Sequence, residues 1–185
     1  KAFVAAEKEL GDVPVLRQAT FYETLRKQLK LQFKFLKLDG KDERLQSMLD
    51  ACYQDIDTTI RKSRQLIEKL AERYRLGVVS NFYGNLETVC QEFEIYRYFT
   101  ALVDSVVVGL RKPDPAIWSL ALKKLEVKPE NAWVVGDSYE RDIMPPKQLG
   151  CKTIWLKGKS WATPPSTEAA DHTIQKFEEI KSILL

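Results

Sequence analysis

Three polar side chains of this 185-residue chain follow short apolar runs in the sequence. The runs lead to the hydroxyl of Ser80, toward the amine of Lys112 and to the carboxylate of Asp137. Such short apolar runs are typical of strands that are buried on both faces of a parallel sheet. Polar groups just beyond the carboxyl ends of parallel strands converge on one crevice, so these three groups are expected to meet. A hydroxyl, an ammonium group and a metal-binding carboxylate in one crevice indicate a phosphate site.

Ser80 and Asn81 are predicted to bind a phosphoryl oxygen. Gly84 lets the backbone turn after the strand, so that the Ser80 hydroxyl and a backbone N–H can point at an anion. The alternative is that Ser80 caps a helix that begins near Gly84. Lys112 is predicted to offset the phosphoryl charge, because its ammonium is a compact cation that needs no bidentate geometry. The alternative for Lys112 is a solvated surface position.

Asp137 and Asp142 are predicted to bind Mg²⁺. This ion prefers hard oxygen ligands and takes only a few of them from protein, keeping phosphate and water as the others. Asp137 is the expected ligand, and Asp142 is expected one helical turn later as a second ligand or as support for the first. The alternative is a pair of acids that stabilises a helix N-terminus through its dipole.

Together these segments resemble the haloacid dehalogenase superfamily, whose members are mostly magnesium-dependent phosphohydrolases. Ser80 matches the second motif of the family and Lys112 the third. Asp137 and Asp142 match the fourth, Gly-Asp-x-x-x-x-Asp. The resemblance implies a Rossmann-like α/β core, with a parallel sheet and helices on both faces, and a small all-helical cap. It also implies that an aspartate attacks phosphorus and forms an aspartyl-phosphate, which water then hydrolyses.

The first motif of the family, Asp-x-Asp-x-Thr, carries the nucleophile and the general acid/base, and it is absent from the start of this sequence. A literal match occurs at residues 55–59. The apolar residues before it recur at steps of three and four, which is typical of an amphipathic helix and not of a strand. We interpret the match as a helix end followed by an N-cap at Asp57 or Thr58. A catalytic role for Asp55 and Asp57 is the alternative.

The missing motif also has a structural consequence. In the family its strand lies between the strands that end at Ser80 and Asp137. Without it, two rows of buried backbone groups would be unpaired, at about 1–3 kcal/mol for each group. We therefore expect an upstream segment to supply this strand, and we expect residues 1–185 alone to turn over poorly. A complete sheet in which the strands of Ser80 and Asp137 pair directly would contradict this expectation.

Hydrophobic periodicity divides the chain into a helical cap at 1–62 and an α/β core at 63–185. The cap is expected to act as a lid that excludes water and shapes specificity. Separate helices are expected at 45–56 and near 66–74. From residue 76 strands and helices alternate, which is typical of βαβ units. Strands are expected near 76–80, 103–108, 132–137, 152–156 and 172–174, and helices near 84–93, 114–125, 140–149 and 176–184.

Composition excludes several classes of partner. The 29 basic and 26 acidic residues nearly cancel, to a net charge of +3, which gives no reason to expect nucleic acid. No apolar run approaches the roughly 20 residues of a membrane span, and no secretory signal is visible. Cys52, Cys90 and Cys151 are far apart among apolar neighbours, which indicates reduced thiols in a cytoplasmic protein. A monomer or homodimer is expected.

The function predicted from the sequence is a Mg²⁺-dependent phosphohydrolase that acts on a small phosphorylated metabolite. Two alternatives stay open. One is an inactive relative that binds a phosphorylated ligand or a protein partner. The other is a carbon–halogen hydrolase of the same family. Because that chemistry needs no magnesium, the pair Asp137 and Asp142 favours phosphate.

Overall fold

The computed structural model describes residues 1–11, 16–38, 43–158 and 170–185. The chain forms two compact units. The first consists of Lys1–Gln65 and Phe82–Arg97, and the second of Leu66–Asn81 and Tyr98–Leu185. The first unit therefore includes a segment that follows the first strand, in addition to the N-terminal residues.

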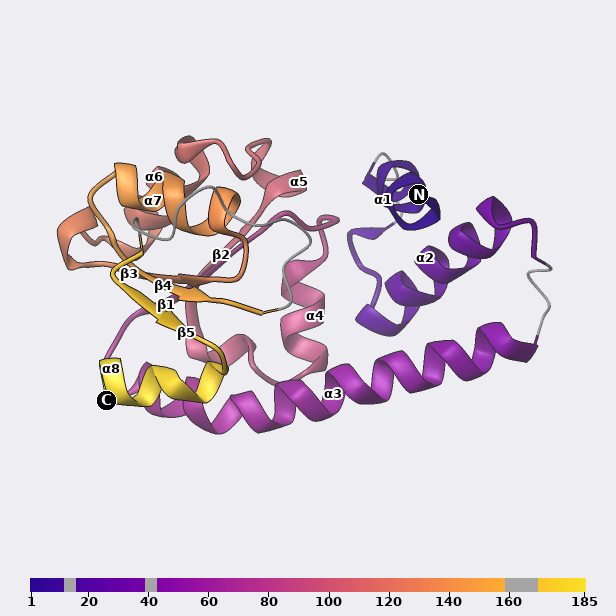
Figure 1. Cartoon of the computed structure of the whole chain (residues 1–185), viewed down its shortest axis with the longest axis horizontal. Coiled ribbons are helices and arrows are strands. Elements are labelled where there is room, and N and C mark those ends of the chain that lie inside the picture. The colour runs from indigo at the N-terminus through magenta and orange to yellow at the C-terminus, as the bar shows by residue number, and fades with distance from the viewer. Residues whose placement is uncertain (12–15, 39–42, 159–169) are drawn as a thin grey trace. The chain divides into compact units, whose positions relative to one another are not determined.

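The described residues of the first unit are helical and contain no strand. Thr20 and Glu23 form a capping box: the Thr20 hydroxyl accepts the N–H of Glu23, and the Glu23 carboxylate accepts the N–H of Thr20 at 2.9 Å. Glu92 accepts the N–H of Phe21 and, at 2.9 Å, the hydroxyl of Tyr53, which ties three helices together. The helices of this unit are α1 (Ala2–Gly11), α2 (Phe21–Phe35), most of α3 (Glu43–Ala71) and α4 (Leu86–Glu92) (Figure 1).

Helix α3 is one continuous helix of 29 residues. The expectation of two helices, with an N-cap at Asp57 or Thr58, is therefore wrong. Asp57 pairs with Arg61 one turn later, at 2.7 Å, and the Thr59 hydroxyl donates to the carbonyl of Asp55. Because such i, i+4 pairs support a helix, the polar stretch continues it. The Asp-x-Asp-x-Thr match at 55–59 thus lies inside a helix of the first unit and not at a strand end.

The second unit is an α/β fold with two parallel sheets, in the orders β1-β2 and β3-β4-β5. Within the described residues, β1 and β3 do not pair with each other. The strands that lead to Ser80 and Asp137 are therefore separate, and the upstream strand stays a prediction. The strands are β1 (Leu76–Ser80), β2 (Phe99–Asp104), β3 (Trp133–Gly136), β4 (Lys152–Leu156) and β5 (His172–Ile174).

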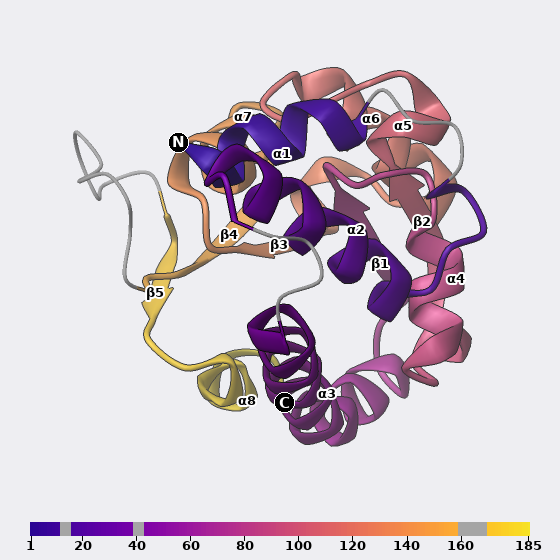
Figure 2. The same cartoon turned by 90° about the vertical axis from the view of Figure 1, so that its right-hand side faces the viewer.

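Helices cover both sides of these strands. Helices α6 (Pro115–Leu125) and α7 (Met144–Gln148) lie on one side and α8 (Lys181–Leu184) on the other (Figures 1 and 2). On the α6 side, Ile117 and Trp118 pack against Val103 of β2. On the other side, the end of α3 packs with β4, β5 and the 3-10 turn Phe177–Ile180. Full burial of one such aliphatic side chain contributes about 1.5–3 kcal/mol, which holds the layers together.

The second strand differs from the expectation of a strand at 103–108. Strand β2 ends at Asp104, and a single helical turn, α5 (Ser105–Val108), follows it. The Asp104 carboxylate accepts the N–H of Val106 at 3.0 Å, and Gly109, at φ 70°, ends the turn in the left-handed region. Caps at both ends therefore turn an apolar run into a helix. No helix in the described ranges is long and apolar enough to cross a membrane.

Candidate active site

Lys112 is the centre of the candidate site. Its side chain is 14% exposed, and its ammonium donates to Asp142 Oδ1 at 2.7 Å and to the carbonyl of Val79 at 3.0 Å. The Asn81 amide holds the backbone of Lys112 from both directions: Oδ1 accepts its N–H at 2.9 Å, and Nδ2 donates to its carbonyl at 3.0 Å. Asn81 therefore attaches the segment that contains Lys112 to the carboxyl end of β1.

Asp142 is buried, and both of its carboxylate oxygens have partners. Oδ1 accepts from Lys112, and Oδ2 accepts the N–H of Ser138 at 3.0 Å. A π-helical turn, Tyr139–Ile143, brings the side chain back over Gly136. A Cβ on Gly136 would lie 2.2 Å from the Cβ of Asp142, so only glycine fits there. The close backbone approach that Gly136 permits is what places Asp142 against Lys112.

Asp137 differs from Asp142 in its surroundings. It follows β3 directly and is exposed. Its carbonyl accepts the indole N–H of Trp155 at 3.0 Å, while its carboxylate makes no hydrogen bond or ion pair with any described residue. The backbone is thus anchored to β4, and the carboxylate is left available to a ligand.

Ser80 is the last residue of β1 and lies opposite Asp104 of β2 in the pairing of the two strands. It stands between Val79, whose carbonyl accepts from Lys112, and Asn81, whose amide holds the same lysine. Contacts therefore group Asn81, Lys112 and Asp142, and Ser80 adjoins this group as the chain neighbour of Val79 and Asn81. Asp137 lines the same cavity as Lys112 and Asp142.

Trp118 supports the site, although no motif in the sequence pointed to it. Its indole N–H donates to the carbonyl of Arg141, at 3.3 Å, inside the π-helical turn. Its ring centre lies 5.7 Å from the ammonium of Lys112, within the range of a cation–π contact. Trp118 thus supports both members of the ion pair. The sequence offered only its position in the helix that follows Lys112, one turn after the Pro115 start.

Two carboxylates at this edge fit a Mg²⁺ ion. Asp137 is available, and Asp142 is shared with Lys112. In the described part of the chain, no three His, Cys, Asp or Glu side chains gather into a larger metal site. Because Mg²⁺ takes one or two carboxylates and completes its shell with phosphate and water, this pair suffices in donor type.

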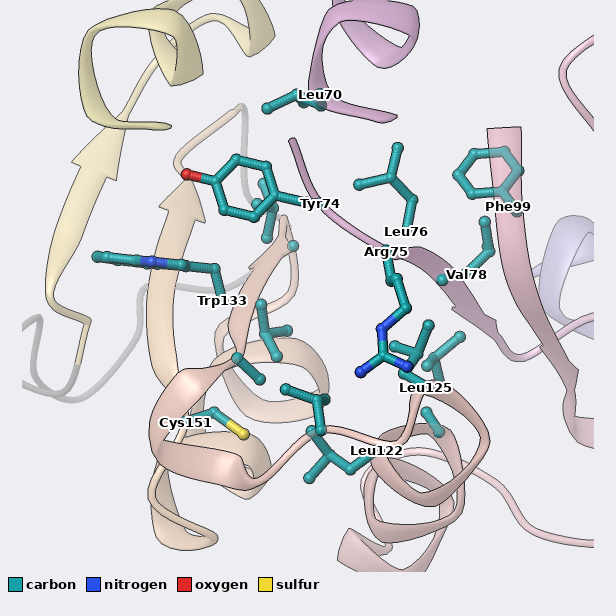
Figure 3. Close-up of a pocket in the computed structure, with 18 of the residues that line it drawn as sticks. Leu70, Tyr74, Arg75, Leu76, Val78, Phe99, Leu122, Leu125, Trp133 and Cys151 are labelled. Atoms are coloured by element: carbon teal, nitrogen blue, oxygen red, sulfur yellow. The ribbon is translucent and has the colours of Figure 1, made fainter. Parts of the chain in front are cut away.

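A cavity of about 640 Å³ lies between β1 and β3 (Figure 3). Lys112, Asp137 and Asp142 line the end of the cavity where both strands finish. Tyr74, Arg75 and Trp133 line the end where the strands begin. Between these ends the walls are mainly aliphatic, and the cavity therefore joins an apolar interior to the polar cluster.

The family model of the haloacid dehalogenase-like hydrolases matches residues 1–150. The chain belongs to this family of hydrolases. Solved structures agree in fold. A HAD phosphatase from Thermococcus onnurineus superposes with a TM-score of 0.56 at 20% identity, over 98% of this chain and 77% of that one. A dehalogenase superposes with a TM-score of 0.64 at 19% identity, over 99% of this chain and 81% of that one.

Relatives in sequence include phosphatases. The chain is 31% identical over 126 residues to the glyceraldehyde 3-phosphate phosphatase of Pyrococcus furiosus, which is 65% of this chain and 52% of the relative. It is 31% identical over 115 residues to the rhythmically expressed gene 2 protein of Drosophila melanogaster, which is 60% of this chain and 44% of the relative. The chain therefore spans about half the length of the curated relatives it matches.

Proposed function

We propose that this haloacid dehalogenase-like hydrolase is a Mg²⁺-dependent phosphohydrolase that acts on a small phosphate monoester. The observation that carries the proposal is the largely buried ammonium of Lys112, held at 2.7 Å from Asp142 and 3.0 Å from the Val79 carbonyl. A cation fixed at the carboxyl end of a strand stabilises the charge that develops on phosphoryl oxygens. The phosphatases among its relatives support this class of substrate.

Each residue of the site has a role in this proposal. The Ser80 hydroxyl binds a phosphoryl oxygen, and Asn81 keeps Lys112 in place. Asp137 binds Mg²⁺ directly, and Asp142 binds it or orients its surroundings while pairing with Lys112. When bound, the ion neutralises phosphoryl charge and fixes the orientation of the substrate. The nucleophile is a carboxylate from a strand outside residues 1–185. It attacks phosphorus as the P–O bond to the alcohol of the monoester breaks, and water then hydrolyses the aspartyl-phosphate to phosphate and the free carboxylate.

The proposal also covers the cellular location, the assembly and the partners of the protein. All three cysteines are free thiols, which supports a cytoplasmic location. The proposed substrate is a small phosphorylated metabolite, and the proposed assembly is a monomer or homodimer. Neither nucleic acid nor a membrane is a proposed partner.

The test replaces two aspartates, one at a time, in a form of the protein that includes the nucleophile strand. Hydrolysis of p-nitrophenyl phosphate should require Mg²⁺ and should fall at least a hundredfold in Asp137→Asn. Asp55→Asn is the matched control, because this aspartate lies inside α3, and it should retain activity. The reverse outcome would make the helical match catalytic and refute the assignment. Hydrolysis of a 2-haloacid in EDTA, without phosphatase activity, would identify a dehalogenase, and phosphate binding without turnover would identify an inactive relative.

A further inference from the structure

Lys157 is the first residue after β4, at the carboxyl end of that strand. Strands β3 and β4 are parallel, and the last pair in their register is Gly136 with Trp155. Neighbouring strands lie about 4.8 Å apart and rise by about 3.3 Å per residue, so the Cα atoms of Lys157 and Asp137 lie roughly 6 Å apart. Because open α/β sheets bind ligands beyond the carboxyl ends of their strands, Lys157 lies beside the candidate site.

Trp155 contacts both of these residues. Its indole N–H donates to the carbonyl of Asp137 at 3.0 Å. Its ring centre lies 5.3 Å from the ammonium of Lys157, which is within the range of a cation–π contact. Trp155 is only 1% exposed, and its ring packs edge-on against Tyr139 at 5.2 Å between ring centres. One buried indole therefore anchors the backbone of Asp137 and holds a cation next to it.

The same arrangement of lysine and indole occurs at Lys112. Its ammonium lies 5.7 Å from the ring centre of Trp118, and the indole N–H of Trp118 donates to the carbonyl of Arg141, the residue before Asp142. The two lysines differ in their partners. Lys112 pairs with Asp142, whereas Lys157 is exposed and forms no ion pair with any described residue. The ammonium of Lys157 is therefore held in place and available to an anion.

We infer that Lys157 is a specificity-determining residue that binds a second anionic group of the substrate. The inference rests on the proposed function, and it narrows the substrate to phosphate monoesters that also carry a carboxylate or a second phosphate. Lys112 meets the phosphoryl group that is transferred, and Lys157 meets the second anion. A lysine suits this role, because its compact ammonium pairs with either kind of anion without a bidentate geometry.

The test measures binding, so it does not depend on turnover. Titration calorimetry in Mg²⁺, on a form of the protein that includes the nucleophile strand, compares three phosphonates. Propylphosphonate has one anionic group, 3-phosphonopropanoate adds a carboxylate, and propane-1,3-bisphosphonate adds a second phosphonate. At least one of the two-anion probes should bind about three- to tenfold more tightly than propylphosphonate, and the larger gain identifies the second group. Equal affinities for all three probes would overturn the inference.

Paired variants assign this preference to one side chain. Lys157→Met should remove the preference for two anions, whereas Lys157→Arg, which keeps the charge, should retain it. Lys152→Met is the matched control, because Lys152 begins the same strand and its ammonium also lies over an indole, 5.4 Å from the ring centre of Trp133. This control has the same net charge as Lys157→Met, and it should keep the preference.

Salt dependence distinguishes recognition of an anion from a structural role. Raising the NaCl concentration from about 0.1 M to about 1 M should weaken the preference of the wild type, since it shortens the Debye length from roughly 10 Å to roughly 3 Å. A loss of affinity in Lys157→Met that is equal for all three probes would show a structural role and overturn the inference. An equal loss of the preference in Lys152→Met would also overturn it, by showing an effect of net charge alone.

Failure of this inference is distinguishable from failure of the phosphohydrolase proposal. If p-nitrophenyl phosphate is hydrolysed in Mg²⁺ but the wild type shows no preference among the phosphonates, the phosphohydrolase proposal stands and the role of Lys157 is refuted. If the preference is present and is lost only in Lys157→Met, while no phosphate ester is hydrolysed, the site for a second anion stands and the catalytic proposal fails.

Discussion

Replacing Gly136 by alanine should strongly destabilise the second unit. The new Cβ would lie 2.2 Å from the Cβ and 2.8 Å from the Cγ of Asp142. A Cβ cannot swing away as a side-chain tip can, so the π-helical turn itself must move. Overpacking costs about 1–3 kcal/mol, and removing one partner from a buried ion pair costs about 3–5 kcal/mol. Because Asp142 is displaced and not deleted, we expect the free energy of unfolding to fall by about 2–4 kcal/mol.

Urea unfolding, monitored by tryptophan fluorescence, measures this effect in the second unit. The tryptophans among the described residues, Trp118, Trp133 and Trp155, belong to the second unit. Gly158→Ala is the matched control, since its Cβ would meet no atom within 4 Å, and its midpoint should stay at that of the wild type. In an Asp142→Gly background the clash is absent, so Gly136→Ala should cost much less there. Equal midpoints for Gly136→Ala and Gly158→Ala, or full additivity with Asp142→Gly, would refute the packing argument.

Three other predictions follow from described contacts. Lys112→Met should lower the free energy of unfolding by about 3–5 kcal/mol, because it leaves the buried carboxylate of Asp142 without its cation. The double variant Lys112→Met with Asp142→Leu should lose less free energy of unfolding than Lys112→Met alone. An equal loss in the two variants would oppose this reasoning. Although burial alone would raise it, the hydrogen bond from Lys147 holds the pKa of Asp171 below its ordinary value. The stability that Asp171 contributes is therefore present above about pH 4 and is lost as the pH falls through the lowered pKa. The melting temperatures of wild type and Asp171→Asn should thus differ at pH 7 and converge as the pH falls below that lowered pKa. Burial and the hydrogen bond to Glu92 raise the pKa of Tyr53 to about 12, so the stability that this phenol contributes is complete below pH 10 and is lost as the pH rises toward 12. The late step in a phenolate absorbance titration should be missing from Tyr53→Phe, and an unchanged step would assign it to another residue.

The sequence predicted those parts of the fold that depend on local pattern. Strand β1, with Ser80 at its end, and strand β3, before Asp137, occur where the apolar runs indicated them. The continuation of α3 through Asp57 and the helical turn α5 were missed, because short contacts decide both. The pair of Asp57 with Arg61 supports the continuous helix α3, and the Asp104 cap supports the helical turn α5. These contacts outweighed the helix end and the strand that the hydrophobic patterns predicted.

The sequence predicted which residues belong to the candidate site, but it did not predict the contacts between them. The motifs named Lys112 and Asp142, yet the 2.7 Å pair between them depends on a π-helical turn that no spacing rule indicates. Gly136 was the available signal, since a glycine before an acidic residue marks a close approach of the backbone. The support from Trp118 depends on packing between α6 and that turn, and the sequence has no marker for it.

The three cysteines give each unit its own chemical reporter. Cys52 is exposed, whereas Cys90 is buried in the first unit and Cys151 in the second. Burial raises the pKa of Cys90 to about 11 and also raises the pKa of Cys151, so both thiols react slowly in the folded protein and faster when their surroundings open. Alkylation under native conditions, resolved by mass spectrometry of the peptides, would therefore time the opening of each half of the molecule separately. Cys52 would calibrate the reagent in the same tube.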